Sequence, residues 1–256
     1  MRAFFAFFKK EWLDWLRSGK FAILFCVFLI LGIMNPAIAK LTPWLMEIMA
    51  ESLEETGLIV SNVEVNALSS WIQFFKNVPM GLILFVFVCS SSFSKEYQSG
   101  TLILLLTKGL KRSMVVITKT TLLILTWSVL FWFCYGVTYL YNSYFWDNSI
   151  VVHLMLAVGC WWLFGIWVIS LMIFFSVVLK SNTGVLSAVG VVIFCMYLLG
   201  MTPKIGKYIP TKLMNASSIL TSMEGTSAYQ NTIVITIVLI IVFIFISIPV
   251  INKKQI

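Results

Sequence analysis

Charged residues are scarce in this chain. They make up 11% of its 256 residues, whereas hydrophobic residues make up 60% and the mean hydropathy is +0.98. A soluble domain carries about 25% charged residues, so the composition predicts an integral membrane protein. The formal net charge is +8. Such a charge indicates nucleic-acid binding only when the cations form a basic face on a soluble domain. Most of these cations instead flank apolar runs, and no nucleic-acid partner is predicted.

Several chemical motifs are also absent. The sequence has no GxxxxGKS/T phosphate loop, no HExxH metal motif and no GxSxG nucleophile elbow. The chain is therefore expected to bind no cofactor and to hydrolyse neither nucleotides nor peptides. Its hydrophobic runs lack Asp and Glu at central depth, where ion-coupled carriers usually place ionisable groups. A channel or secondary carrier is disfavoured, so energy for any transport has to come from another chain.

The cysteines and the single histidine indicate no metal site. All five cysteines lie in apolar runs without CxxC or CxxxC spacing, so they are expected to be small packing residues rather than disulfide or zinc ligands. They are Cys26, Cys89, Cys134, Cys160 and Cys195. His153 lies near the outer end of an apolar run, where an interfacial or packing role is favoured over a proton relay.

Six apolar runs are long enough to cross a bilayer, which takes about 20 residues of helix. They predict an all-α membrane protein with a single transmembrane domain over residues 1–256. The expected spans are residues 21–39, 71–93, 115–141, 149–179, 183–201 and 232–251. Pro36 is expected to kink or end the first span. The fourth run is long and uncharged, so it has to tilt, break or extend beyond the bilayer.

Residues 2–17 predict an amphipathic helix in the headgroup region. Apolar residues recur at helical spacing on one face, and cations lie opposite them, while Phe7 and Glu11 interrupt the pattern. The apolar face comprises Phe4, Phe5, Phe8, Trp12, Trp15 and Leu16, and the residues expected at the interface are Lys9, Lys10, Trp12 and Trp15. The alternative is the n-region of a signal peptide, with Ala37-Ile38-Ala39 as the cleavage site. The length and aromatic content of the segment disfavour it.

Two polar segments, residues 40–70 and 202–230, are expected on the outer side. In the first, Thr42 and Pro43 predict the start of a short amphipathic helix that ends near Gly57. Its glutamates at four-residue spacing predict a solvated face, with a cation site as the less favoured alternative. The second segment is too polar to span and is expected to enter the membrane partway as re-entrant pieces.

The cation distribution predicts the orientation of the chain. With both termini in the cytoplasm, thirteen Lys and Arg residues lie on the inner side and five on the outer side. This asymmetry satisfies the positive-inside rule. It places residues 94–114, between the second and third spans, in a cytoplasmic loop.

This loop carries the most specific motif of the chain. From Glu96 onward it reads EYQSGTLILLLTKGLKR, followed by Lys119 at the expected snorkelling start of the third span. An acidic residue, a Gly-Thr pair and a leucine-rich turn before a basic stretch resemble the signature of ABC-2 type permeases. The six-span layout and the N-terminal helix resemble the same family across almost the whole chain. Gly109 departs from the family, in which many relatives carry proline there.

The resemblance implies a permease subunit that dimerises with itself or with a related permease in a bacterial cell membrane. Two copies of a separate ATPase subunit would hold ATP and Mg and receive a short coupling helix from the loop. Anchoring of the loop at the lipid headgroups is an alternative role. The residues expected to couple are Glu96, Tyr97, Gly100, Thr101, Leu102, Leu105, Lys108 and Arg112.

By analogy with the family, a substrate path would lie at the dimer interface along the second and fifth spans. Its candidate lining is Phe74, Phe75, Phe85, Phe87, Phe194, Met196 and Tyr197. Such a lining suits an amphipathic or hydrophobic cargo, although lipid-facing or packing roles are the usual ones for such aromatic stripes. A membrane-active peptide, as in exporters of phenol-soluble modulins, is the leading candidate. A lipid, an antibiotic or an envelope glycan stays open, as does a membrane anchor or sensor that recruits an ATPase.

Overall fold

The computed structural model describes residues 2–53, 65–98, 107, 109–179, 181–202, 204–221 and 225–253. Six helices in this part of the chain are long and apolar enough to cross a membrane, and it contains no strand. They are α2 (Lys20–Leu53), α3 (Ala67–Gln98), α5 (Arg112–Phe145), α6 (Leu154–Val178), α7 (Asn182–Gly200) and α9 (Ser227–Lys253). The predicted all-α architecture with six spans is confirmed.

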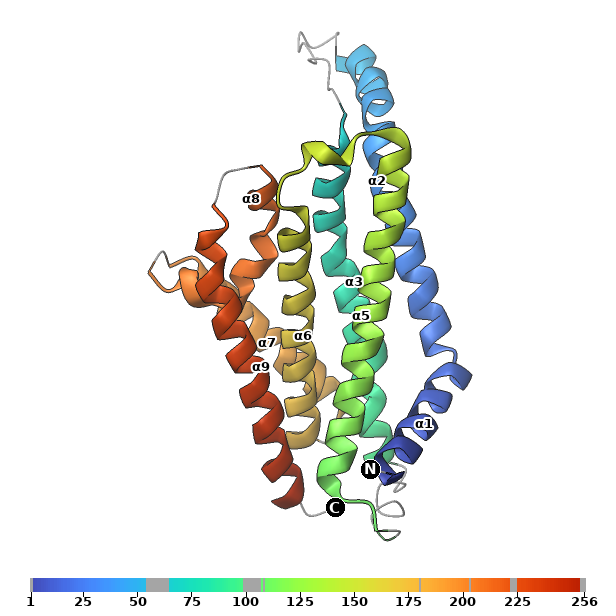
Figure 1. Ribbon diagram of the computed structural model, residues 1–256, viewed down its shortest axis with the longest axis vertical. Coiled ribbons are helices and arrows are strands. Elements are labelled where there is room, and N and C mark those ends of the chain that lie inside the picture. Colours follow the sequence, from blue (N-terminus) through green and yellow to red (C-terminus); the bar gives the residue numbers. More distant parts are fainter. Residues whose placement is uncertain are drawn as a thin grey trace.

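The long helices run side by side along one axis, and both ends of the chain lie at the same end of the bundle (Figure 1). This end is called proximal here, and the opposite end, where α5 turns into α6, is called distal. Helix α1 (Arg2–Arg17) lies obliquely at the proximal end and contacts α2 and α5. Helix α6 packs most extensively on α9, and α2 packs on α3 and α5.

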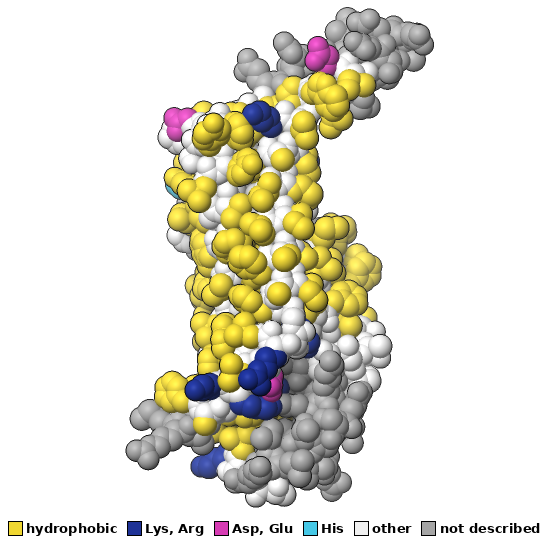
Figure 2. All heavy atoms as spheres, turned by 90° about the vertical axis from the view of Figure 1, so that its right-hand side faces the viewer, with side chains coloured by type: hydrophobic (Ala, Val, Ile, Leu, Met, Phe, Trp, Pro, Cys, Tyr) yellow, Lys and Arg dark blue, Asp and Glu magenta, His cyan; other side chains and the backbone are white. Residues whose placement is uncertain are grey.

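The surface of the bundle has the charge distribution of a membrane protein. Figure 2 shows one face, on which hydrophobic side chains cover the middle and charged side chains gather toward the two ends. A band of this kind is what a hydrocarbon core of about 30 Å requires, because charges inside it would lose their hydration.

Helix α2 is continuous, so the expected break between the first span and a separate outer helix is wrong. Both Pro36 and Pro43 lie inside the helix. Proline at position 36 cannot donate to the carbonyl of Gly32, and the hydroxyl of Thr138 on α5 donates to that carbonyl instead, at 3.0 Å. Thr42 caps no new helix, because its hydroxyl donates to the Ile38 carbonyl one turn earlier. Helix α5 therefore supplies the hydrogen-bond donor that Pro36 cannot offer to the Gly32 carbonyl.

The long fourth run breaks near its start rather than continuing as one helix. Asn148–Ile150 form the short helix η2, and α6 begins only at Leu154. The break lies at His153, the one described non-glycine residue with a positive φ, 56°. Of the options left open by the sequence, the chain thus uses a break, which leaves α6 with 25 residues.

The segment after α7 folds along the bundle in short pieces. These are η3 (Gly206–Tyr208), η4 (Pro210–Asn215) and α8 (Ser217–Leu220). The indole nitrogen of Trp161, two turns into α6, donates to the Met214 carbonyl at 3.0 Å, and Thr232 near the start of α9 donates to the Lys207 carbonyl at 2.7 Å. The segment therefore lies beside the distal parts of α6 and α9 (Figure 1). Its entry into the membrane stays a prediction.

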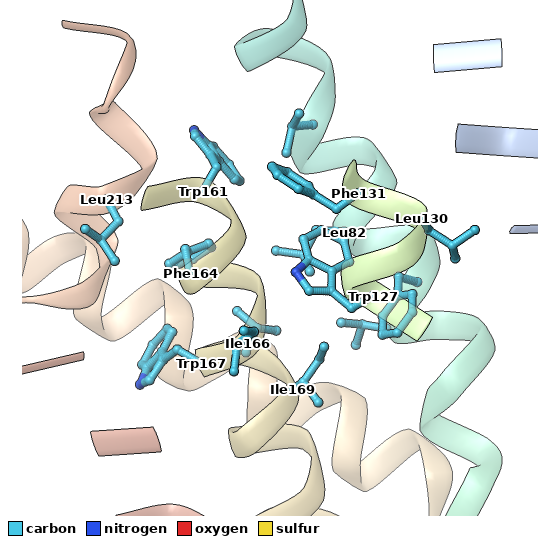
Figure 3. Packing of buried hydrophobic residues seen from close by; sticks show 14 of the residues in the cluster. Leu82, Trp127, Leu130, Phe131, Trp161, Phe164, Ile166, Trp167, Ile169 and Leu213 are labelled. Atoms are coloured by element: carbon cyan, nitrogen blue, oxygen red, sulfur yellow. The ribbon is translucent and has the colours of Figure 1, made fainter. Parts of the chain in front are cut away.

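Tryptophan side chains hold the centre of the bundle together. Trp127 of α5 lies directly over Gly165 of α6, where an added Cβ would come within 2.3 Å of the indole ring. Its nitrogen donates to the Trp162 carbonyl at 3.2 Å, and Trp162 donates in return to the hydroxyl of Ser128 at 3.0 Å. Figure 3 shows Trp127 and Phe131 of α5 directed toward α6. Glycine at position 165 thus sets the close approach of α5 and α6.

Candidate coupling and transport sites

The predicted coupling residues lie between the proximal ends of α3 and α5. Glu96 and Tyr97 fall in the last turn of α3, and their side chains are outside the described part of the chain. The other five loop residues predicted to couple lie outside the described residues altogether: Gly100, Thr101, Leu102, Leu105 and Lys108. Their roles stay predictions.

Arg112, the last predicted coupling residue, begins α5 and contacts α9. Its Nη1 atom donates to the carbonyls of Ile251, at 3.3 Å, and Asn252, at 3.2 Å. These carbonyls belong to the last turn of α9, where helix carbonyls lack partners and the helix dipole attracts a cation. Arg112 therefore joins the start of the third span to the end of the sixth, a contact that the sequence analysis missed.

Lys119 does not snorkel, and the expectation that it does is wrong. Its Nζ donates to Glu11 Oε2 of α1 at 2.8 Å, and the two side chains are only 2% and 6% exposed. Lys10 Nζ lies 3.0 Å from the other carboxylate oxygen, Oε1, and 3.3 Å from Asp14 Oδ2. Lys119 thus faces the protein because a buried carboxylate on α1 neutralises it.

The carboxyl of Glu11 is held in its ionised form. Burial alone would raise its pKa, but the charge and hydrogen bond of Lys119, followed by those of Lys10, bring this pKa below the ordinary value of 4.5. The Glu11–Lys119 contact is therefore an ion pair, and it joins α1 to a residue seven positions into α5.

The buried stripe of α1 differs from the predicted apolar face. Phe7, Glu11 and Trp15, at four-residue spacing, are buried against the bundle, whereas Phe5 and Leu16 are exposed. Among the residues expected at the interface, Lys9 and Lys10 are exposed, Trp12 is half-buried against Phe21 and Trp15 is buried. Their contact with lipid stays a prediction.

One signal for this stripe was present in the sequence. Phe7 and Glu11 were noted as interruptions of the pattern, but with Trp15 they share one helix face at four-residue spacing. A glutamate between two aromatic residues on such a face can be buried only when a cation on another helix pairs with its carboxylate. That cation, Lys119, is far away in the sequence.

A pocket of about 270 Å³ lies among α3, α6 and α7. Its lining is uncharged and consists of Pro79, Leu82, Ile83, Val86, Phe87, Trp161, Phe164, Val168, Leu186, Val189, Gly190, Ile193 and Met214. Helices α3 and α7 are the second and fifth spans, the two expected along the substrate path. A pocket of this composition has room for an apolar group and no partner for a charge.

The predicted path residues separate into two groups. Phe74, Phe75 and Phe85 are buried in the core, where Phe85 packs edge-to-face on Trp127. The structure thus gives these three a packing role. Phe87 lines the apolar pocket, and Phe194 and Tyr197 of α7 are exposed. Met196 is half-buried, and its carbonyl accepts a hydrogen bond from Thr211.

These elements define a multi-pass membrane protein whose N-terminal helix is joined to its third span at the proximal end. The chain belongs to the ABC-2 transporter family, because the family model described as ABC-2 family transporter protein matches residues 5–233. It is therefore a permease component of an ABC transporter. Members of this family generally lie in a membrane and work with an ABC ATPase. No curated protein matches the sequence of this chain.

Proposed function

We propose that the chain is the permease subunit of an ATP-driven exporter of amphipathic or hydrophobic substrates. In this proposal it dimerises, binds two ATPase subunits that hold ATP and Mg, and lies in a bacterial cell membrane with both termini in the cytoplasm. The observation that carries the proposal is the uncharged pocket between α3 and α7 in a chain of the ABC-2 transporter family.

The distribution of cations supports this orientation. Arg17, Lys20, Arg112 and Lys253 lie at helix ends on the proximal side. Lys and Arg in short loops favour the cytoplasmic side. The loop between α3 and α5 is then accessible to an ATPase in the cytoplasm. The ATPase would shift the loop between two positions, one favoured when the ATPase is open and one favoured when it has bound ATP.

A second permease copy accounts for the exposed apolar face beside the pocket. On α3, Met80, Ile83 and Phe87 are exposed, and Val191, Phe194 and Leu198 are exposed on the neighbouring α7. Apposition of two such faces would cover both pockets and form a shared path between the two copies. A membrane-active peptide fits such a path, because its apolar side can be desolvated while its polar side faces a hydrated centre.

Filling the pocket tests the proposed path. Gly190 lines the pocket, and a Cβ added there meets no atom within 4 Å, so Gly190→Leu would place a side chain in the open space beside the pocket lining. Gly159 has the same open surroundings but does not line the pocket. With the ATPase partner in liposomes, Gly190→Leu should lower the stimulation of ATP hydrolysis by an amphipathic peptide, and Gly159→Leu should preserve it. Equal stimulation in both variants would contradict a path through this pocket.

The coupling loop needs a separate test. Gly100→Pro is expected to lower the stimulation of the ATPase without preventing membrane insertion, because proline would break a helix that docks on the ATPase. Unchanged stimulation would count against docking by this loop. If no peptide or lipid changes the ATPase rate of the unmodified complex, a membrane anchor or sensor becomes the better function.

A further inference from the structure

A larger cavity lies at the distal end, on the opposite end of the bundle from the proposed coupling loop. It measures about 1230 Å³ and is formed by the last turns of α5, the connection to α6 and the first turn of α6. Its lining is Tyr135, Gly136, Tyr139, Leu140, Ser143, Tyr144, Phe145, Trp146, Asp147, Asn148, Ser149, Val151, His153, Leu154 and Met155.

The cavity is divided into a polar rim and an apolar floor. Asp147, Ser149 and His153 belong to the connection at the helix ends, whereas Tyr135 and Gly136 lie about ten residues deeper on α5. At 1.5 Å per residue this depth is about 15 Å. A ligand that filled the cavity would therefore have a polar end and an apolar end.

The rim has one fixed negative charge among the lining residues. Asp147 Oδ1 accepts from the Ser149 amide at 2.9 Å, and Oδ2 accepts from the Ser149 hydroxyl at 2.7 Å. The bond from the Ser149 side chain, followed by that from its backbone, lowers the pKa of the Asp147 carboxyl. The carboxylate is therefore ionised at neutral pH. Neither lysine nor arginine is among the lining residues, although Lys40 Nζ lies on the ring of the lining residue Phe145.

The aromatic rings of the rim are suited to a cation. Tyr144, Phe145 and Trp146 follow one another along the chain, and Tyr144 is largely exposed. One ring of this group already carries an ammonium, because Lys40 Nζ lies 3.7 Å from the centroid of Phe145. Aromatic faces attract ammonium groups, and most strongly when several rings surround one cation.

The floor of the cavity is open at Gly136. A Cβ added at Gly136 meets no atom within 4 Å, and this glycine lines the cavity. Tyr135 lies beside Gly136 on α5, and Leu140 one turn further along the same helix adds an apolar side chain to the lining. This deep part can accept a hydrocarbon chain. Aromatic residues that served only as an anchoring belt at the membrane interface would need no such space.

We propose that the distal cavity binds an amphipathic organic cation, with its ammonium group at Asp147 and the Tyr144 and Trp146 rings and its hydrocarbon chain beside Gly136. The ammonium can come from a free alkylammonium compound or from the headgroup of a lipid. With the proposed orientation this site faces the outer leaflet. Binding itself requires neither the ATPase nor transport, so it can fail or succeed independently of the proposed function.

The test is equilibrium binding of labelled decyltrimethylammonium to the full chain in neutral maltoside micelles, with protein-free micelles as the baseline. A saturable signal is expected for this probe, with much weaker signals for tetramethylammonium, which lacks the chain, and for decyl sulfate, which has the opposite charge. Competition by phosphatidylcholine would identify a lipid as the source of the headgroup, and lack of competition would identify a free cation. Equal binding of decyl sulfate, or no saturable signal, would overturn the proposal.

Variants locate the bound probe. Gly136→Leu should abolish saturable binding by filling the floor, whereas Gly159→Leu, a glycine with equally open surroundings outside the cavity, should leave it unchanged. Asp147→Asn should weaken binding about fivefold through loss of the charge. Because Asp147 is exposed, this variant tests the site even if Gly136→Leu is unstable.

The rings are tested with two tyrosines of the same helix. Tyr144→Ala should weaken binding about twofold to fivefold, and Tyr141→Ala, an exposed tyrosine outside the cavity, should not. Affinity that is unaffected by Gly136→Leu, Asp147→Asn and Tyr144→Ala would refute the assignment to this cavity.

Discussion

Replacing Lys119 with methionine tests the ion pair that joins α1 to α5. The change keeps an unbranched side chain but leaves the Glu11 carboxylate, 6% exposed and 2.8 Å from the lost ammonium, without its main partner. Removing one partner of a buried pair costs about 3–5 kcal/mol, because the remaining charge stays desolvated. Lys10 still contacts Glu11 at 3.0 Å but is itself 45% exposed, so we expect a loss near the lower value, about 3 kcal/mol.

The loss should appear as undocking of α1 rather than as unfolding of the bundle. The connection in the chain between α1 and α2 consists of Ser18 and Gly19, so α1 can leave its position without breaking a span. A change of about 3 kcal/mol raises the undocked population about 100-fold. Trypsin cleavage after Arg17, followed by mass spectrometry, measures that population, because cleavage requires the segment to open.

Two comparison variants make the result specific. Lys9→Met removes an exposed cation of α1 and should leave the cleavage rate unchanged. Combining Glu11→Gln with Lys119→Met should restore most of the protection, because no buried charge is then left unpaired. If the Lys119→Met variant is cleaved at the unmodified rate, the pair does not hold α1 and the reasoning is refuted.

The same pair predicts a pH dependence. The folded protein lowers the pKa of Glu11 below 4.5, so the undocked helix binds the proton more readily and docking gains stability as the pH rises. The contribution is fully present above about pH 4.5 and is lost as the pH falls through the lower folded pKa. Hydrogen exchange of the α1 amides, a readout that works at acidic pH, should show a loss of protection in that range for the unmodified chain, and the variant with both substitutions should lack this loss.

Three further substitutions test packing between spans. Gly165→Ala should lower the melting temperature in detergent through overpacking of about 1–3 kcal/mol, because the added Cβ lies 2.3 Å from Trp127, whereas Gly159→Ala has open space and should not. Thr138→Val should destabilise by about 1 kcal/mol in unfolding titrations by removing the hydroxyl that bonds to the Gly32 carbonyl. Arg112→Gln should speed hydrogen exchange in the last turn of α9, with unchanged exchange contradicting the contact with Ile251 and Asn252.

The spans were predictable from the sequence because each needs a long uncharged run, a signal that depends on neighbouring residues alone. The fifth span, expected over residues 183–201, is α7 at Asn182–Gly200. The predicted break after the first span was wrong because the effect of Pro36 on the helix depends on a residue far away in the sequence. The Thr138 hydroxyl that takes the freed carbonyl lies on another helix, and no local pattern encodes that contact.

The candidate sites were less predictable for the same reason. A lysine near the start of a span usually snorkels, and only the fold brings Glu11 to Lys119. Phe85 and Phe87 lie two positions apart on one helix, yet the first is buried against Trp127 and the second lines the pocket. The analogy with the family selected the helices of the path, whereas the rotation of α3 against its neighbours decides which of its rings are accessible.

The contacts of α5 and α7 indicate which wall of the pocket would move in the proposed transport cycle. Helix α5 is bound to α1 through Lys119 and to α9 through Arg112, so force on the proposed coupling loop would displace these helices together. Helix α7 has only Val185 and Val189 buried among its residues, and Val189 itself lines the pocket. Separating α7 from α3 therefore uncovers at most two fully buried residues of α7, and it breaks no ion pair among the described residues. A substrate larger than the 270 Å³ pocket would be admitted by displacement of α7, while the helices tied at the proximal end move as one unit.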